Sequence, residues 1–112
     1  MAAIYVSNLV VNTGANFSQT FTLSSTDDNA AFNLDGYTAT SQMRKWAGAV
    51  GVTTFTTEIA DAASGTIIIS LTNAQTLALK PGRHVYDIIV TSGATKQRVV
   101  EGAVLVRQGV TR

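Results

Sequence analysis

Alternation of apolar and polar side chains with a period of two residues runs through most of this sequence. In the segment FSQTFTL at residues 17–23, Phe17, Phe21 and Leu23 fall on one face of an extended chain, and the intervening Ser and Thr side chains fall on the other. Successive side chains of a β-strand point to opposite faces, whereas a helix repeats every 3.6 residues. The helical period is almost absent here, so the pattern predicts an all-β protein.

Seven segments carry this strand pattern, and turns rich in Gly, Asn and Asp separate them. They span residues 4–11, 17–23, 37–46, 54–59, 66–71, 84–91 and 97–107. Three consecutive Ile residues in 66–71 are typical of a strand covered on both faces. With no long helix, the seven segments predict a seven-stranded antiparallel immunoglobulin-like β-sandwich, and a partly open barrel is the alternative.

One short helix is predicted after the fifth strand. Thr72 and Gln75 have the spacing of a capping box, in which each side chain accepts a hydrogen bond from the backbone amide of the other residue. Because Pro81 and Gly82 form a turn soon afterwards, this helix can be only about one turn long.

Three residues stand out within the last two strands. Gly102 interrupts a long strand, which predicts a bulge or a close approach by another backbone. Asp87 lies in an apolar strand, and an unpaired carboxylate between two sheets would cost several kcal/mol. It must therefore face solvent, a partner subunit or a basic residue such as Arg98. Tyr86 is expected to bury its ring and to need a partner for its hydroxyl.

The chain of 112 residues is expected to form a single domain over 1–112, with possible extended arms at 1–8 and 107–112. It contains no Cys, so disulfides are excluded. Charged residues make up 13% of the sequence, and Ser and Thr occupy many polar positions, which favours close contact with neighbouring proteins. No segment approaches the roughly 20 apolar residues needed to cross a bilayer, and no signal peptide is visible.

The charge is unevenly distributed along the sequence. Residues 1–79 carry two basic and five acidic residues (2 − 5 = −3), and residues 80–112 carry six basic and two acidic residues (6 − 2 = +4). Two interpretations stay open: the portions could dock head to tail between copies, or the charges could intermix in the fold. The net charge of +1 gives no field that would attract nucleic acid or an anionic membrane.

No set of residues predicts catalysis, a cofactor or a metal. His84 is the only histidine, and Asp87, three positions along the same strand, points to the opposite face. The oxygen-rich group Asp27, Asp28 and Asp35 does not have the spacing of a calcium loop. We therefore expect no enzyme activity, no catalytic residue, no cofactor and no metal site.

The order of the motifs resembles a known group of proteins. The stretches 65–76, 79–88 and 100–106 and the ending Val110-Thr111-Arg112 are similar to small β-sandwich proteins and N-terminal domains of tailed-phage structural components, such as baseplate upper proteins and tail-fibre attachment domains. The similarity is greatest to short proteins of contractile-tailed cyanophages. His84 departs from the pattern, which usually has Tyr or another residue there. The resemblance implies a virion structural role.

The leading hypothesis is a non-catalytic phage virion subunit of the tail, baseplate, neck or capsid decoration. It would be assembled in the host cytoplasm, would contact other phage structural proteins, would form a homo-oligomer and would bind neither nucleic acid nor membrane. The candidate interface residues are Tyr5, Arg44, Trp46, Asp87, Arg107 and Arg112. The alternative is a carbohydrate- or receptor-binding β-sandwich module, with Tyr37, Trp46 and Tyr5 as stacking platforms. Burial of Trp46 would argue against that alternative.

Overall fold

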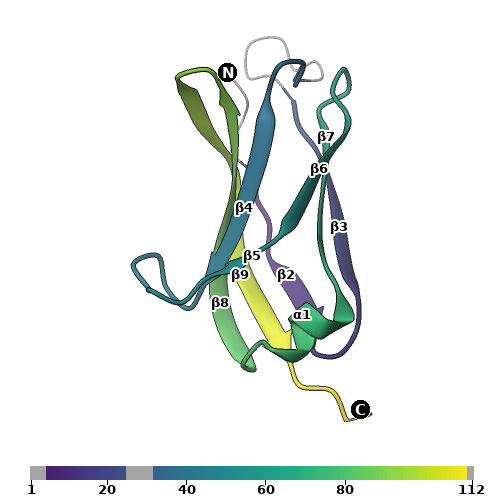
Figure 1. Cartoon of the computed structure of the whole chain (residues 1–112), viewed down its shortest axis with the longest axis vertical. Coiled ribbons are helices and arrows are strands. Elements are labelled where there is room, and N and C mark those ends of the chain that lie inside the picture. The colour runs from purple at the N-terminus through teal and green to yellow at the C-terminus, as the bar shows by residue number, and fades with distance from the viewer. Residues whose placement is uncertain (1–4, 25–31, 111–112) are drawn as a thin grey trace.

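Two facing β-sheets form the body of the protein (Figure 1). The computed structural model describes residues 5–24 and 32–110, and the molecule is elongated, with extents of 45 × 27 × 22 Å. The strands run along the long axis, and the apolar side chains of both sheets meet between them. The prediction of an all-β fold with two sheets is confirmed.

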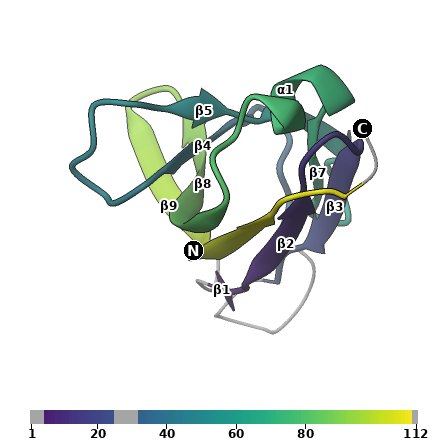
Figure 2. The same cartoon turned by 90° about the horizontal axis from the view of Figure 1, so that it is seen from below.

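The larger sheet has six strands in the order β1-β9-β8-β4-β5, and β2 also pairs with β9. Its strands are β1 (Tyr5–Val6), β2 (Leu9–Asn12), β4 (Thr38–Arg44), β5 (Thr53–Thr54), β8 (Gly82–Ser92) and β9 (Thr95–Arg107). The smaller sheet has the order β3-β7-β6, with β3 (Phe17–Thr22), β6 (Thr56–Asp61) and β7 (Thr66–Leu71). Seen from below, the larger sheet curls like half a barrel (Figure 2).

The expectation of seven strands, all antiparallel, is wrong at the start of the chain. The single strand expected at 4–11 is two short strands, and both run parallel to β9. At the break between them, the Ser7 amide donates to the Glu101 carbonyl, and the Asn8 side-chain oxygen accepts from the Ala103 amide. A two-residue alternation is the same in parallel and antiparallel strands, so the sequence pattern does not reveal this direction. The immunoglobulin-like topology is not confirmed.

The segment expected as one strand at 54–59 also divides, because the chain changes sheets at Phe55. Its side chain is buried, and its amide donates to the Ser41 carbonyl of β4 at 3.0 Å. The residues before Phe55 pair with β4, whereas those after it pair with β7 in the other sheet. Phe55 packs between Phe17 and Tyr86, at ring-centroid distances of 6.0 and 6.2 Å.

Of the two alternatives predicted for Gly102, a bulge or a close approach by another backbone, the structure shows the close approach. A Cβ atom at position 102 would lie 2.1 Å from the Ser7 carbonyl oxygen, so the predicted close approach at Gly102 is confirmed. The bulge lies elsewhere, because the register between β8 and β9 shifts around Val99. Val99 and Val100 are consecutive, and both side chains are buried. In a regular strand, neighbouring side chains point to opposite faces, so a bulge is needed to bury both on the same face.

The helix α1 (Asn73–Leu77) follows β7, and its predicted capping box between Thr72 and Gln75 is confirmed. The Thr76 hydroxyl is buried, accepts from the Gly14 amide at 3.0 Å and donates to the Ala15 carbonyl at 2.8 Å. These bonds fix α1 to the turn between β2 and β3. Within residues 5–24 and 32–110, the helical structure lacks the length and the run of apolar side chains that a membrane-spanning helix requires.

Candidate interaction surface on the larger sheet

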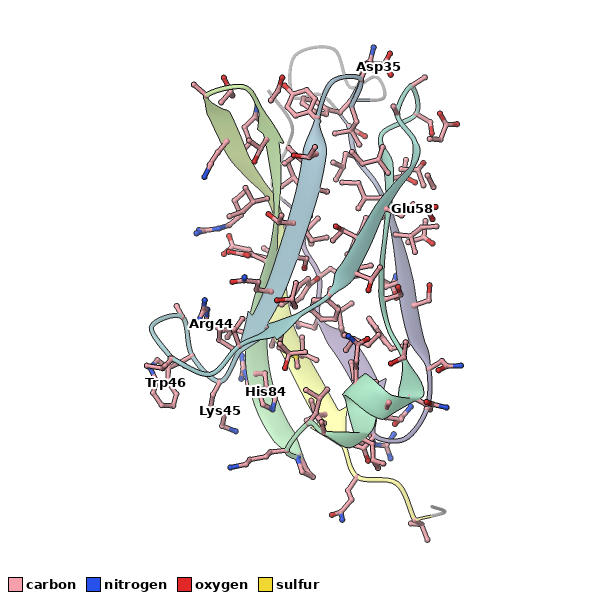
Figure 3. The ribbon with its side chains drawn as sticks, in the orientation of Figure 1. Asp35, Arg44, Lys45, Trp46, Glu58 and His84 are labelled. Carbon is pink, nitrogen blue, oxygen red and sulfur yellow. The ribbon has the colours of Figure 1, made fainter. Side chains whose placement is uncertain are left out.

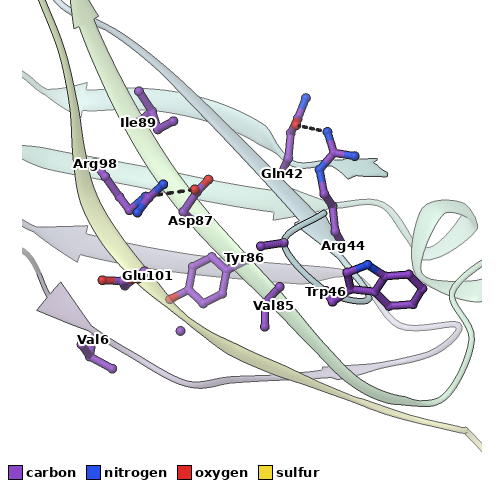
Figure 4. A pocket seen from close by; sticks show the side chains of 12 residues that line it. Val6, Gln42, Arg44, Trp46, Val85, Tyr86, Asp87, Ile89, Arg98 and Glu101 are labelled. Carbon is purple, nitrogen blue, oxygen red and sulfur yellow. Dashed lines mark hydrogen bonds and ion pairs between the residues drawn. The ribbon is translucent and has the colours of Figure 1, made fainter. Parts of the chain in front are cut away.

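A hollow of about 650 Å³ lies on the outer face of the larger sheet, where alternate side chains of β4, β8 and β9 point away from the core (Figure 4). Its floor contains the aliphatic side chains of Val85 and Ile89, and polar side chains lie between and around them. The full lining is Val6, Gln42, Arg44, Trp46, Ala47, Val85, Tyr86, Asp87, Ile89, Arg98, Glu101 and Gly102. Charged, amide, aromatic and aliphatic side chains therefore lie together on this surface.

The strand register places a row of side chains across the hollow. Gln42 lies opposite Asp87, and Asp87 lies opposite Glu101. Like charges directly opposite each other destabilise a sheet. Arg98 offsets this effect, because its Nε lies 3.2 Å from Asp87 Oδ2. The pair is half exposed, so it adds less than about 1 kcal/mol to stability. Two of the environments expected for Asp87 are therefore observed: it pairs with the basic side chain of Arg98, and it is partly exposed to solvent.

Arg44 fixes the loop that follows β4. Its Nη1 donates to the Ala49 carbonyl at 2.6 Å, and its Nη2 donates to Gln42 Oε1 at 3.1 Å. The Ala49 amide in turn donates to the Trp46 carbonyl at 2.9 Å. Figure 3 shows Trp46 on this projecting loop, and its side chain is 63% exposed. One arginine therefore joins the sheet to the loop that presents the tryptophan.

Three of the six candidate interface residues come together here: Arg44, Trp46 and Asp87. Arg107 lies apart, at the end of β9. The backbone of Tyr5 pairs with Val100, while its side chain and the whole of Arg112 lie outside the described residues.

The expected arms at both ends are in part bound to the body. Residues 5–8 run along β9, and residues 1–4 lie outside the described part. After Arg107, the Gly109 amide donates to the Thr13 hydroxyl at 2.9 Å. Val110 is fully exposed.

Of the aromatic residues expected as stacking platforms, the two with described side chains, Tyr37 and Trp46, lie apart. Tyr37 precedes β4 and packs on Phe32 at a centroid distance of 5.6 Å, whereas Trp46 follows the other end of the same strand. Burial of Trp46 would have argued against a carbohydrate-binding module, but the side chain is exposed. Sequence reasoning missed Gln42 and Glu101, which only the pairing of the strands brings beside Asp87.

Basic residues gather at one end of the molecule. Five of the seven Lys and Arg residues in the described ranges lie where β4 and β9 end and β8 begins: Arg44, Lys45, Lys80, Arg83 and Arg107. Asp35 and Asp61 lie at the opposite end, together with Lys96; Figure 3 shows Asp35 there, far from Lys45. The acidic residues Asp27 and Asp28 lie outside the described residues.

The single histidine forms a hydrogen bond with the backbone. His84 is buried, and its Nε2 lies 2.9 Å from the Lys80 carbonyl oxygen, while Asp87 points to the outer face. Within residues 5–24 and 32–110, no group of three or more His, Asp and Glu residues could hold a metal ion. Burial raises the pKa of the Tyr86 phenol to about 12, and its hydroxyl finds the expected partner in the Ser7 carbonyl.

No known family model matches the chain, and no curated protein matches it. Among solved structures, the N-terminal domain of phage TP901-1 ORF48 superposes with a TM-score of 0.55 at 12% identity, over 94% of this chain and 97% of that chain. The chain shares its fold with a phage protein domain. This correspondence is of the fold alone, but it extends over nearly the whole of both chains.

Two further solved structures overlap more loosely. Listeria monocytogenes InlP gives a TM-score of 0.44 at 16% identity, over 92% of this chain and 26% of that chain. A family 123 glycoside hydrolase from Clostridium perfringens gives 0.47 at 12% identity, over 96% of this chain and 24% of that chain. Neither supports an inference about this protein.

Proposed function

We propose that the protein is a non-catalytic structural subunit of a phage virion that acts through contacts with other protein chains. The observation that carries this proposal is the fold shared with the phage ORF48 N-terminal domain over nearly the full length of both chains. The order of the sequence motifs supports the same class. The finer assignment to contractile-tailed cyanophages rests on those motifs alone, and the tail, baseplate, neck and capsid surface are all candidate locations.

The absence of a catalytic role is part of the proposal. His84 is bound to a backbone carbonyl, and Asp87 is paired with Arg98 on the other face of the strand. An acid–base pair must lie within hydrogen-bond reach of one substrate proton. His84 and Asp87 do not share a face, so they do not form such a pair.

The edge of the smaller sheet favours contact between copies. Among the described residues, β3 pairs with β7 alone, and its sequence FSQTFT contains no charged residue. The opposite edge, β6, carries Glu58 and Asp61. Unpaired strand edges are templates for further strands, and charged residues suppress such pairing. We therefore propose that copies of the chain associate through β3.

Light scattering after size-exclusion chromatography tests this contact. We expect the wild-type chain to form a defined oligomer and Thr20→Lys, at the exposed face of β3, to give a folded monomer. Thr56→Lys is the matched control, because it adds the same charge to an exposed threonine on β6. A wild-type chain that is monomeric at all concentrations would contradict self-association.

The virion role is tested separately in particles. Mass spectrometry of purified virions should detect the wild-type chain at a fixed stoichiometry. A variant that lacks residues 108–112 should fold normally and be lost from particles if the C-terminal end makes an assembly contact. Undiminished incorporation of that variant would refute the arm, and absence of the wild-type chain from virions would refute the proposed function.

A further inference from the structure

An exposed tryptophan stands at the rim of the hollow on the larger sheet. Trp46 is the only tryptophan in the sequence, and its side chain is 63% exposed, in contrast with the buried Phe21, Phe32 and Phe55. No residue in the described ranges bonds its indole Nε1. An indole combines a broad apolar face with a polar donor, and such residues are enriched where proteins bind partners.

The loop that carries Trp46 is held in position before any ligand arrives. Arg44 bonds the Ala49 carbonyl at 2.6 Å, and Ala49 bonds the Trp46 carbonyl at 2.9 Å. A Cβ atom at Gly48 would lie 3.8 Å from the indole ring, so the backbone passes close beneath it. A preorganised loop loses less entropy when it binds a ligand.

Across the hollow from the indole, the strands present polar groups with unused hydrogen-bond capacity (Figure 4). Asp87 uses Oδ2 for the Nε of Arg98, and no described residue bonds its Oδ1. The Glu101 carboxylate likewise makes no hydrogen bond within the described part of the chain. Sugar hydroxyls both donate and accept, so they need carboxylate acceptors and guanidinium donors side by side. Adjacent strands lie about 4.8 Å apart, a separation comparable to the width of a pyranose ring.

The charges that line the hollow cancel. Arg44 and Arg98 contribute two positive charges, and Asp87 and Glu101 contribute two negative charges, so 2 − 2 = 0. A balanced site does not select an anionic or a cationic ligand by its field. Its volume of about 650 Å³ lies within the range of roughly 300–1,000 Å³ that is usual for ligand pockets.

We propose that this hollow binds a neutral oligosaccharide. Trp46 stacks on one sugar ring, Asp87, Glu101 and Arg98 bind the hydroxyls of the next ring across β8 and β9, and the aliphatic floor of Val85 and Ile89 contacts the C–H face between them (Figure 4). A site of this kind would give the subunit a glycan-binding activity in addition to its structural role.

The single tryptophan makes the test direct. Wild-type protein is titrated with maltohexaose, cellohexaose and chitohexaose to about 10 mM, tenfold above a weak Kd of ~1 mM. Indole fluorescence and the ¹⁵N-labelled indole and backbone amides are followed. We expect at least one oligosaccharide to shift the Trp46 indole signal together with amides near Asp87 and Glu101. Trp46→Ala and Asp87→Asn should each weaken binding at least tenfold, and binding is read from the amides for the tryptophan variant.

Val50→Ala is the matched control. Val50 lies in the same loop and is 96% exposed, but it does not line the hollow. Its variant should bind as the wild type does. The proposal is overturned if none of the three oligosaccharides shifts the indole signal, or if Trp46→Ala retains full affinity. It is also overturned if Trp46→Ala instead dissociates an oligomer while no sugar binds, because the face is then a protein interface. Incorporation into particles should be unchanged in Trp46→Ala, which separates this proposal from the structural function.

Discussion

The Tyr86 hydroxyl donates a hydrogen bond of 2.7 Å to the backbone carbonyl of Ser7, which lies 79 residues earlier in the chain. Ser7 sits at the break between β1 and β2, where the regular pairing with β9 is interrupted. Tyr86 lies on β8, on the far side of β9 from this break. The bond therefore fastens the first residues of the chain to the centre of the larger sheet.

Replacing Tyr86 with Phe should lower stability at neutral pH by about 1 kcal/mol, the usual net value of one hydrogen bond. Chemical denaturation measures this change. Tyr37→Phe is the control, because its hydroxyl makes no hydrogen bond with any residue in the described ranges. An equal loss in the two variants would show that the Ser7 bond has no special role.

The same phenol should make stability depend on alkaline pH. Burial raises the pKa of Tyr86 to about 12 from its ordinary value of 10.0. Between these values the unfolded chain loses the proton and the folded chain keeps it, so the contribution is fully present below pH 10 and is lost as pH rises through 12. The melting temperature of the wild type should fall more steeply over this interval than that of Tyr86→Phe. Parallel curves for the two proteins would contradict this prediction.

Gly102→Ala should destabilise the fold by about 1–3 kcal/mol, since the added methyl group overlaps the Ser7 carbonyl and must push β1 away from β9. Hydrogen exchange should show loss of protection at the Ser7 amide, which bonds Glu101. Gly51→Ala is the matched control, because a Cβ at that position meets no atom within 4 Å. Similar stability of the two variants would show that the strands can separate at no cost.

Thr76→Val should cost about 2 kcal/mol, because it removes a buried hydroxyl that bonds both the Gly14 amide and the Ala15 carbonyl, and these bonds are partly shielded from water. Thr72→Ala removes an exposed helix cap and should cost only about 1 kcal/mol. The melting temperatures of the two variants show which substitution costs more stability. If Thr72→Ala is the more damaging change, the attachment of α1 to the preceding turn is less important than its cap.

The paired charges on the outer face predict that the effect of Asp87→Asn on stability has opposite signs in the presence and absence of Arg98. In the wild type, Asp87→Asn removes the ion pair with Arg98 and should be neutral or slightly destabilising. In the Arg98→Ala background, the same change removes repulsion between Asp87 and Glu101 and should be stabilising by a few tenths of a kcal/mol. A double-mutant cycle at low salt measures the difference. Destabilisation in both backgrounds would exclude the repulsion.

Local chemistry made much of the fold predictable from the sequence. The alternation around Phe21 identifies a strand, Thr72 and Gln75 identify the start of the helix, and Gly102 identifies a crowded backbone. The parallel direction of β1 and β2 was not predictable, because periodicity carries no information on direction. The change of sheets at Phe55 was missed for a similar reason: a single residue can end one strand and begin another without a turn signal.

The candidate site was predictable only in part, since it depends on register. A two-residue turn between β8 and β9 would place Asp87 opposite Val100 in a regular hairpin. The extra residue Val99 shifts the pairing by one, so Asp87 meets Glu101 instead. No Gly or Pro marks this bulge, and the sequence around it continues the strand pattern. Arg44, Trp46 and Asp87 could be named from the sequence, but their arrangement around one hollow could not.

The parallel pairing of β2 with β9 determines how the protein would respond to tension. The described chain enters the body through β1 and β2 and leaves it through β9, at the opposite end of the long axis. A force that pulls the two ends apart would slide neighbouring strands past each other, so the hydrogen bonds between Leu9–Asn12 and Val104–Arg107 would be loaded together and not opened one at a time. Resistance to such a pull is governed by the unfolding rate, and this arrangement would let the domain serve as a tether that transmits load along its length.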